Sequence, residues 1–330
     1  MAMTGKTRFG GMKMVALPNG NNEEERTMNF HGIIPPVVTL FDEAGNLDLA
    51  LNRRYIDQLI SRNINGILLM GSSGEFSSLT IEEQKLYVRE MIKHINGRIP
   101  VMVGVGHTAL KEVLELTSYA EEHGADGILV VSPYYWKLSD EQLYRFYSIV
   151  ANHTKLQVFI YNIPLLTGQN LPVELIKKLA EAHPNIAGIK ETVSDFGHLR
   201  QVLAEVTKVR SDFRVFSAFD EHMLPAQMIG AAGSINGSAV FAPEISVNLY
   251  ESYQKGDLAE AQKNHQIISK LMELYTFGPT FFTAMKEAVH QRWFDVAAGH
   301  RAPCDVYPAD LRDNVAALLK NIEMKEGIQL

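Results

Sequence analysis

QVFIYNIP at residues 157–164 and IAGIKET at residues 186–192 are the two stretches that decide the fold of this chain. Each contains a short run of apolar residues, which is typical of a parallel strand buried on both faces. The segment between them has the length of a helix, and Pro172 stands where a helix start tolerates proline. Together these segments indicate two parallel strands joined by a right-handed helical crossover.

The alternation of apolar runs and helical segments continues on both sides of this unit. The runs start mostly about 30 residues apart, which favours a (β/α)8 barrel over an open doubly wound sheet. The eight predicted strands are residues 32–41, 66–71, 100–106, 127–135, 157–164, 186–192, 214–220 and 233–240. Two capping-box pairs, Thr80 with Glu83 and Ser139 with Gln142, predict the starts of two helices between them. The predicted fold class is therefore α/β, a TIM barrel with appended C-terminal helices.

The domain organisation follows from where the alternation begins and ends. We expect a flexible N-terminal arm at 1–28, the barrel at 29–245 and a helical extension at 246–330. Within the extension, helices are predicted at 247–253, 258–274 and 280–293. Two roles are open for it, covering a face of the barrel or building an oligomer.

Composition and charge limit the kinds of partner. A formal net charge of -7 over 330 residues argues against binding to nucleic acid or to an anionic membrane surface. The arm lacks the run of about 7 to 15 apolar residues of a signal peptide, and no stretch approaches the roughly 20 that span a bilayer. The single cysteine, Cys304, excludes intrachain disulfides and thiolate metal clusters. We therefore expect a cytoplasmic protein that binds a small molecule.

Polar residues at the ends of the predicted strands are the candidates for chemistry, because TIM-barrel active sites lie at those ends. The turn at 71–75, GSSGE, offers two hydroxyls and backbone N–H groups that can hold a carboxylate. Lys190 follows an apolar run, and alternation along the strand could point its side chain into the barrel mouth, where its amine can form a Schiff base. Tyr161 ends the neighbouring strand, and its phenol can transfer a proton.

Four motifs together resemble the N-acetylneuraminate lyase and dihydrodipicolinate synthase family of class I aldolases. They are GSSGE at 71–75, SPYY at 132–135, YNIP at 161–164 and GIKET at 188–192. The resemblance runs from about Phe30 to the C-terminus, and the order and spacing of the motifs agree with it. Serines stand at 72 and 73, where the family usually has threonines.

The resemblance implies roles for individual residues and for the assembly. Lys190 would be the Schiff-base lysine and Tyr161 the proton-transfer residue, and both belong to the catalytic set with Ser72 and Tyr135. Tyr135 would reach the site of a neighbouring subunit in a homotetramer built as a dimer of dimers. The predicted substrate-binding residues are Ser72, Ser73, Gly74, Asp220, Glu221 and Ile235.

Position 166 separates the branches of the family. The synthase branch usually carries there an arginine that grips the aldehyde's carboxylate, and Leu166 cannot form that bidentate contact. The stretches 134–137 and 166–169 resemble the subgroup that cleaves 2-keto-3-deoxy sugar acids, of gluconate or pentonate type, to pyruvate and an aldehyde. N-acetylneuraminate lyase and 4-hydroxy-tetrahydrodipicolinate synthase activity are the alternatives. At 218–221, Asp220 and Glu221 keep the two carboxylates of the sialic acid lyases, but that branch's glycine and tyrosine are absent.

The Schiff-base mechanism needs no metal or organic cofactor, and none is expected. A metal-dependent aldolase on a similar barrel is a second hypothesis, although the neighbours of His107 offer no second ligand at metal-binding spacing. A third, of another class, is a barrel that binds keto acids without turning them over. A binding protein would have no need of the phenol of Tyr161, so we favour the enzyme.

Overall fold

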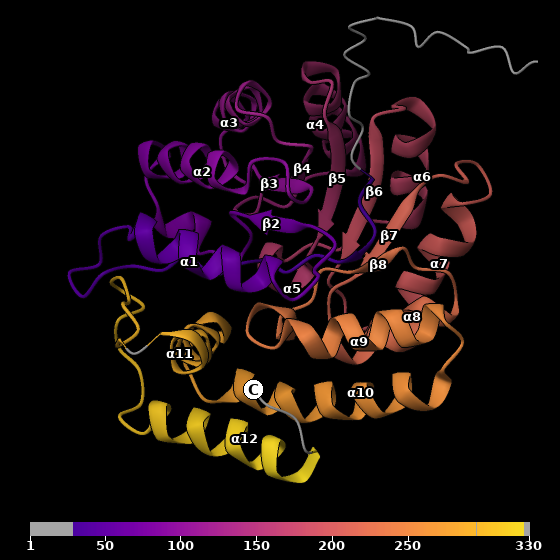
Figure 1. Ribbon diagram of the computed structural model, residues 1–330. Coiled ribbons are helices and arrows are strands. Elements are labelled where there is room, and N and C mark those ends of the chain that lie inside the picture. The colour runs from indigo at the N-terminus through magenta and orange to yellow at the C-terminus, as the bar shows by residue number, and fades with distance from the viewer. Residues whose placement is uncertain (1–28, 295, 327–330) are drawn as a thin grey trace, which may run out of the picture.

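The structure is a computed structural model that describes residues 29–294 and 296–326 (Figure 1). The predicted arm at 1–28 lies outside the described residues. The strands are β1 Gly32–Ile33, β2 Ile67–Leu69, β3 Val101–Gly104, β4 Gly127–Val131, β5 Gln157–Asn162, β6 Ile186–Glu191, β7 Arg214–Ser217 and β8 Gly233–Ser234. All are parallel, in the order β1-β8-β7-β6-β5-β4-β3-β2, and a parallel bridge from Pro36 to Leu68 joins the two ends. The predicted (β/α)8 barrel is confirmed.

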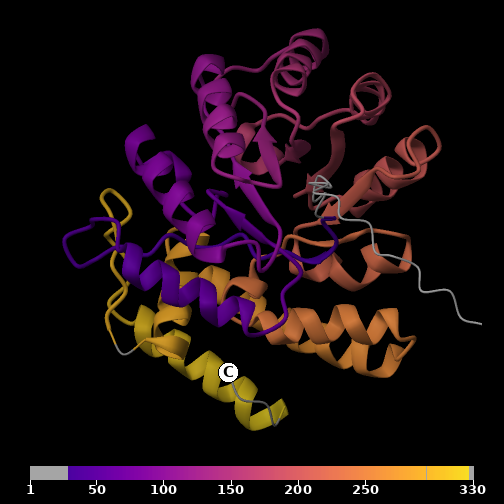
Figure 2. The ribbon, with the colours of Figure 1, turned by 45° about the horizontal axis from the view of Figure 1, so that its top comes forward.

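Helices surround the strands on the outside (Figure 2). They are α1 Leu49–Ile60, α2 Ile81–Ile95, α3 Leu110–Glu122, α4 Asp140–His153, α5 Pro164–Thr167, α6 Val173–Ala182, α7 Phe196–Val206, α8 Met223–Met228, α9 Pro243–Gln254, α10 Leu258–Leu271, α11 Phe281–Trp293 and α12 Leu311–Glu326. Both predicted capping boxes are present, at Thr80 and at Ser139, and Pro172 is the N-cap of α6. None of the described helices is long and apolar enough to cross a membrane.

The strands are shorter than the apolar runs that predicted them. After β2 the backbone leaves the ladder and turns, with Gly74 N donating to Gly71 O at 3.0 Å and Glu75 N to Ser72 O at 3.1 Å. The runs after β7 and β8 continue as short 3-10 helices, η2 Asp220–His222 and η3 Ser238–Val240. Burial alone therefore does not define a strand, since these loops are covered by the C-terminal helices. Helix α12 was not predicted.

Two apolar clusters separate the inside of the barrel from the layer between strands and helices. The inner cluster contains no residue of an α-helix, and in β5 it takes Phe159 and Tyr161, whereas the outer one takes Val158 and Ile160. Phe159 packs edge-to-face against Phe30 at 5.2 Å between ring centroids. Side chains thus alternate between inside and outside along the strand, as a β-strand requires.

A β-bulge in β6 interrupts this alternation. Val158 pairs with Ile186, but the next residue, Phe159, pairs with Gly188, so Ala187 is an extra residue in β6. Ile186 faces outward, and strict alternation from it would also point Lys190 outward, toward the helices. The bulge shifts the alternation by one residue. Lys190 therefore pairs with Tyr161 and faces the barrel interior with it.

The residue after Lys190 consequently faces outward into a buried polar network. Glu191 is fully buried and accepts hydrogen bonds from Asn162 Nδ2 and His198 Nδ1, the latter at 3.3 Å. The other ring nitrogen of His198 lies 3.0 Å from Leu171 O. Both imidazole nitrogens face acceptors, and the bond to Glu191 in particular raises the pKa of His198. Burial raises the pKa of Glu191. Each of the two groups therefore keeps its own proton to a higher pH than it would in water.

The bulge yields a prediction for Gly188→Ala. A Cβ at this position would lie 2.3 Å from Arg214 O and 2.8 Å from the Phe159 ring, so backbone or ring must move. We expect the free energy of unfolding in urea to fall by about 1–3 kcal/mol, the usual cost of overpacking. The control is Gly66→Ala, whose Cβ would have its nearest contacts at 3.3 Å and 3.4 Å and should cost less. Equal stability of both variants would contradict the tight fit.

The Glu191–His198 pair yields a prediction for pH dependence. Because folding raises the pKa of His198, its stabilising contribution is complete below the unfolded pKa of about 6.5 and is lost as pH rises through the folded value. Urea unfolding should therefore show a larger loss for His198→Gln at about pH 6 than at about pH 9. In a Glu191→Gln background this difference should disappear, and a loss that is independent of pH in both backgrounds would refute the pairing.

Candidate active site

A cavity of about 280 Å³ opens at the C-terminal ends of the strands. Its lining residues come from strand ends, from the loops after them and from the C-terminal helices. They are Pro36, Ser72, Ser73, Tyr161, Ile163, Leu165, Leu166, Lys190, Thr192, Ala218, Phe219, Asp220, Ile235, Gly237, Tyr275, Phe281 and Met285. Among the residues predicted from sequence, this cavity brings together Lys190, Tyr161, Ser72, Ser73, Asp220 and Ile235.

Lys190, Tyr161 and Ser72 form a chain of polar atoms in the cavity. Lys190 Nζ donates to Tyr161 Oη at 3.3 Å, and that phenol lies 3.2 Å from Ser72 Oγ. The amine also sits 4.4 Å from the centroid of the Tyr161 ring. Both Lys190 and Tyr161 are only 4% exposed. An amine, a phenol and a hydroxyl in contact can form a covalent adduct and pass a proton beside it.

The serine turn, residues 71–75, packs against the segment after β1. Thr39 Oγ1 donates to Gly74 O at 2.6 Å, and a Cβ on Gly74 would come within 3.0 Å of Val37 O. Gly74 therefore shapes the turn and does not line the cavity. Ser73 is buried, while Ser72 is half-buried beside the cavity. The turn ends at Glu75, which adopts a left-handed φ of 53°.

Glu75 makes a buried ion pair that sequence reasoning missed. Its partner, Lys286 in α11, is 0% exposed, and Lys286 Nζ also lies 4.2 Å from the centroid of the Phe41 ring. Burial lowers the pKa of Lys286 and raises that of Glu75, and the charge of each partner opposes the shift of the other. One signal was available, since Lys286 stands among the small and apolar residues of FFTAMKEAV at 281–289.

The two acidic residues predicted to bind substrate lie in different surroundings. Asp220 is 2% exposed and Oδ1 accepts from Asn236 Nδ2, Ser238 N and Ser238 Oγ. Its Oδ2 accepts from Tyr275 Oη at 2.5 Å. Asp220 thus lines the cavity with both oxygens engaged by the protein. Glu221 is exposed and is not among the lining residues.

The C-terminal helices complete the cavity. Tyr275, in η4 Met272–Thr276, and Phe281 and Met285 of α11 all line it. Burial raises the pKa of Tyr275, which keeps its phenol protonated to donate to Asp220. Of the two roles left open for the extension, these contacts agree with the first, because part of the extension lies against the C-terminal ends of the strands, and the oligomer role stays a prediction.

Tyr135 lies outside the cavity of its own chain. It follows β4 with Trp136, and the two side chains are 78% and 71% exposed. Their rings meet edge-to-face at 5.0 Å. A patch of exposed aromatic side chains is typical of a surface that contacts another molecule.

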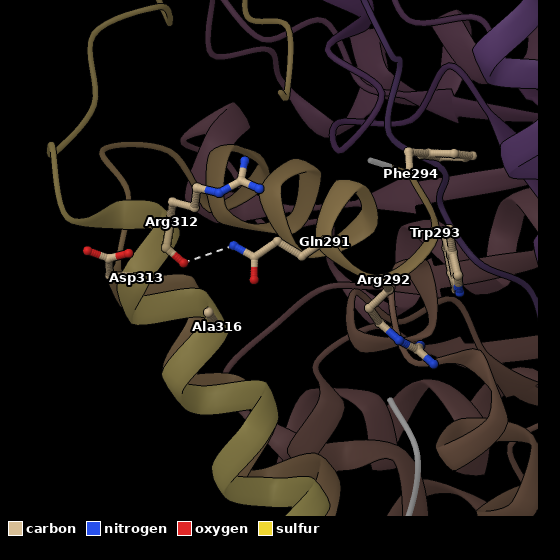
Figure 3. A pocket seen from close by; sticks show the side chains of 7 residues that line it. All are labelled: Gln291, Arg292, Trp293, Phe294, Arg312, Asp313 and Ala316. Atoms are coloured by element: carbon tan, nitrogen blue, oxygen red, sulfur yellow. Dashed lines mark hydrogen bonds between the residues drawn. The ribbon is translucent and has the colours of Figure 1, made fainter. Parts of the chain in front are cut away.

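A second hollow, of about 540 Å³, lies between α11 and α12 (Figure 3). It shares no lining residue with the Lys190 cavity. Gln291 Nε2 donates to Arg312 O at 2.8 Å, and Arg292 donates to Phe241 O and pairs with Glu244. Its polar groups serve mainly to join the C-terminal helices, and it holds none of the residues predicted to be catalytic.

His107, the histidine weighed as a metal ligand, has a structural contact. Its Nδ1 accepts from Ala109 N at 2.9 Å, just before α3. It does not line the Lys190 cavity. Within residues 29–294 and 296–326, no group of three or more His, Cys, Asp and Glu side chains is arranged to hold a metal ion.

Known proteins are similar to this chain over most of its length. YagE of Escherichia coli K12, provisionally named a 2-dehydro-3-deoxy-D-gluconate aldolase, is 41% identical over 260 residues, 79% of this chain and 86% of YagE. YjhH of the same organism, provisionally named a 2-dehydro-3-deoxy-D-pentonate aldolase, is 38% identical over 257 residues, 78% of this chain and 85% of YjhH. The crystal structure of YagE in complex with pyruvate superposes with a TM-score of 0.87 and 37% identity, covering 89% of this chain and 99% of that one. Residues 29–322 match the dihydrodipicolinate synthetase family, and the chain belongs to that family.

Proposed function

We propose that this protein is a class I aldolase that cleaves a 2-keto-3-deoxy sugar acid, of gluconate or pentonate type, to pyruvate and an aldehyde. The observation that carries the proposal is the buried amine of Lys190, which lies 3.3 Å from Tyr161 Oη in a cavity of about 280 Å³. Family membership supports it, as do the names of YagE and YjhH and the pyruvate bound in the YagE structure.

The mechanism assigns one step to each group. Lys190 Nζ attacks C2 of the keto acid, and loss of water gives an iminium. The hydroxyls of Ser72 and Ser73 bind the substrate carboxylate. Tyr161 takes the proton from the C4 hydroxyl, the C3–C4 bond breaks to release the aldehyde, and the iminium accepts the electron pair as an enamine. Protonation at C3 and hydrolysis then release pyruvate and the free lysine.

The lining of the cavity favours this substrate class over the two alternatives. Leu166 lines the cavity where a synthase needs a guanidinium, and no arginine is among the described lining residues. For sialic acid, the sugar hydroxyls would meet Ala218 and Phe219, and Asp220 already has four protein donors. A barrel that only binds keto acids would not need the phenol of Tyr161 beside the amine.

The assembly and location belong to the same proposal. Tyr135 reaches the site of a partner subunit in a homotetramer, a dimer of dimers, which the exposure of Tyr135 and Trp136 supports. The reaction takes place in the cytoplasm, with which the lone Cys304 is compatible.

The covalent step can be tested by reductive trapping. Borohydride added with pyruvate should reduce the iminium, inactivate the enzyme and add one pyruvate-derived mass to the peptide that contains Lys190. Lys190→Ala should neither cleave substrate nor take up the pyruvate-derived mass. Lys286 is an internal control, because it is also a buried lysine but does not line the cavity. Mass spectrometry that finds the adduct on another lysine, or on none, would overturn the assignment.

Tyr161→Phe separates iminium formation from bond cleavage, because it removes only the hydroxyl. Borohydride should still trap pyruvate slowly, while the rate of aldol cleavage falls by about 10²–10⁴-fold, the usual cost of losing a general acid or base. The control is Tyr134→Phe, whose ring packs against Phe76 outside the cavity lining and which should cleave normally. If Tyr161→Phe cleaved substrate at the wild-type rate, a water held by Ser72 would be the next candidate for the proton transfer.

A further inference from the structure

The buried ion pair between Glu75 and Lys286 links the serine turn to the C-terminal helices. Glu75 is the residue directly after the turn's Ser72, Ser73 and Gly74, and its side chain is 1% exposed. The side chain of Lys286 is 0% exposed and comes from α11, at the other end of the chain. The pair is therefore a direct electrostatic contact between the predicted carboxylate site and the extension.

Stability alone is a weak reason for such a pair. The free energy needed to remove two charges from water often exceeds the free energy gained from their attraction. Apolar side chains of similar volume can therefore replace such a pair without loss of stability. Phe41, whose ring centroid lies 4.2 Å from Lys286 Nζ, shows that the surroundings include apolar groups. In some proteins a buried charged pair instead fixes one arrangement of the elements that carry it.

The position of Lys286 in α11 suggests which geometry is fixed. Its neighbour Met285 lines the cavity, and so does Phe281 at the start of the helix. The turn that ends in Glu75 also contributes Ser72 and Ser73 to the lining of this cavity. The pair thus joins the serine turn directly to the helix that forms part of the cavity wall.

We propose that Glu75 and Lys286 are positioning residues that hold Ser72 and Ser73 in place for the carboxylate of the 2-keto acid. The inference rests on the proposed function, because carboxylate binding by these serines is part of it. The carboxylate does not react, so its contacts act equally on bound substrate and transition state. Loss of the pair should therefore raise KM by a larger factor than it lowers kcat, which can also fall because Ser72 contacts Tyr161.

The first test is Lys286→Met, which keeps an unbranched side chain only one atom shorter and removes its charge. We expect KM for the keto acid to rise about tenfold, the size of one lost hydrogen bond to a charged group, and kcat to fall by a smaller factor. In borohydride trapping, half-saturation should shift upward for pyruvate but not for its neutral amide. A shift of equal size for both ligands would overturn the proposal, because the effect would not depend on the carboxylate.

The double variant Glu75→Gln with Lys286→Met separates positioning from stability. Lys286→Met alone leaves a buried carboxyl without its partner, which should lower Tm, and Glu75→Gln should restore much of that loss. The tether is still absent in the double variant, so its KM should stay raised. If KM recovered together with Tm, the pair would be structural only and the proposal would be wrong.

Val289→Ala is the matched control, since Val289 is fully buried in α11 and is not a cavity-lining residue. It should lower Tm without changing KM.

Trapping of pyruvate by the wild-type enzyme separates the proposed function from the positioning role of the ion pair. If the wild type traps no pyruvate, the proposed function fails. If it traps pyruvate with the same half-saturation as Lys286→Met, only the positioning role fails.

Discussion

The extra residue in β6 is the constraint on which the site depends. Because Ala187 has no partner in β5, the side chains of β6 change face between Ile186 and Gly188. Lys190 then shares the barrel interior with Tyr161, and the amine and phenol lie 3.3 Å apart. Without the extra residue, alternation from the Val158–Ile186 pair would point the Lys190 amine outward, toward the helices. Gly188 allows this path, since the Phe159 ring and the Arg214 carbonyl occupy the space of a side chain.

The bulge also explains why a carboxylate is buried directly beside the proposed nucleophile. When Lys190 turns inward, Glu191 must turn outward, into the layer between barrel and helices. A buried charge there is tolerated only with hydrogen-bond partners, which Asn162 and His198 supply. Two neighbouring residues are thus held by polar contacts on opposite faces of one strand.

The C-terminal extension is part of the site and not an addition to it. It supplies Tyr275, Phe281 and Met285 to the cavity wall, and Lys286 to the serine turn. A barrel alone offers its loops at the open end of the strands, and these loops need a rigid neighbour to hold one conformation. Here the neighbour is α11, which packs over that end through both apolar and charged contacts.

The sequence by itself determined the barrel, both capping boxes, and the placement of Lys190, Tyr161 and the serine turn at strand ends. These features follow from periodicity and from short motifs, which are properties of neighbouring residues. We expected an inward Lys190 from alternation along the strand, but strict alternation from Ile186 points it outward, and only the bulge in the pairing of β6 with β5 turns it inward. Only the tertiary structure decided the bulge, the four donors on Asp220 and the pairing of Glu75 with Lys286. The physical reason is that these contacts join residues far apart in the chain, and no local pattern records which strand register or which helix will meet them.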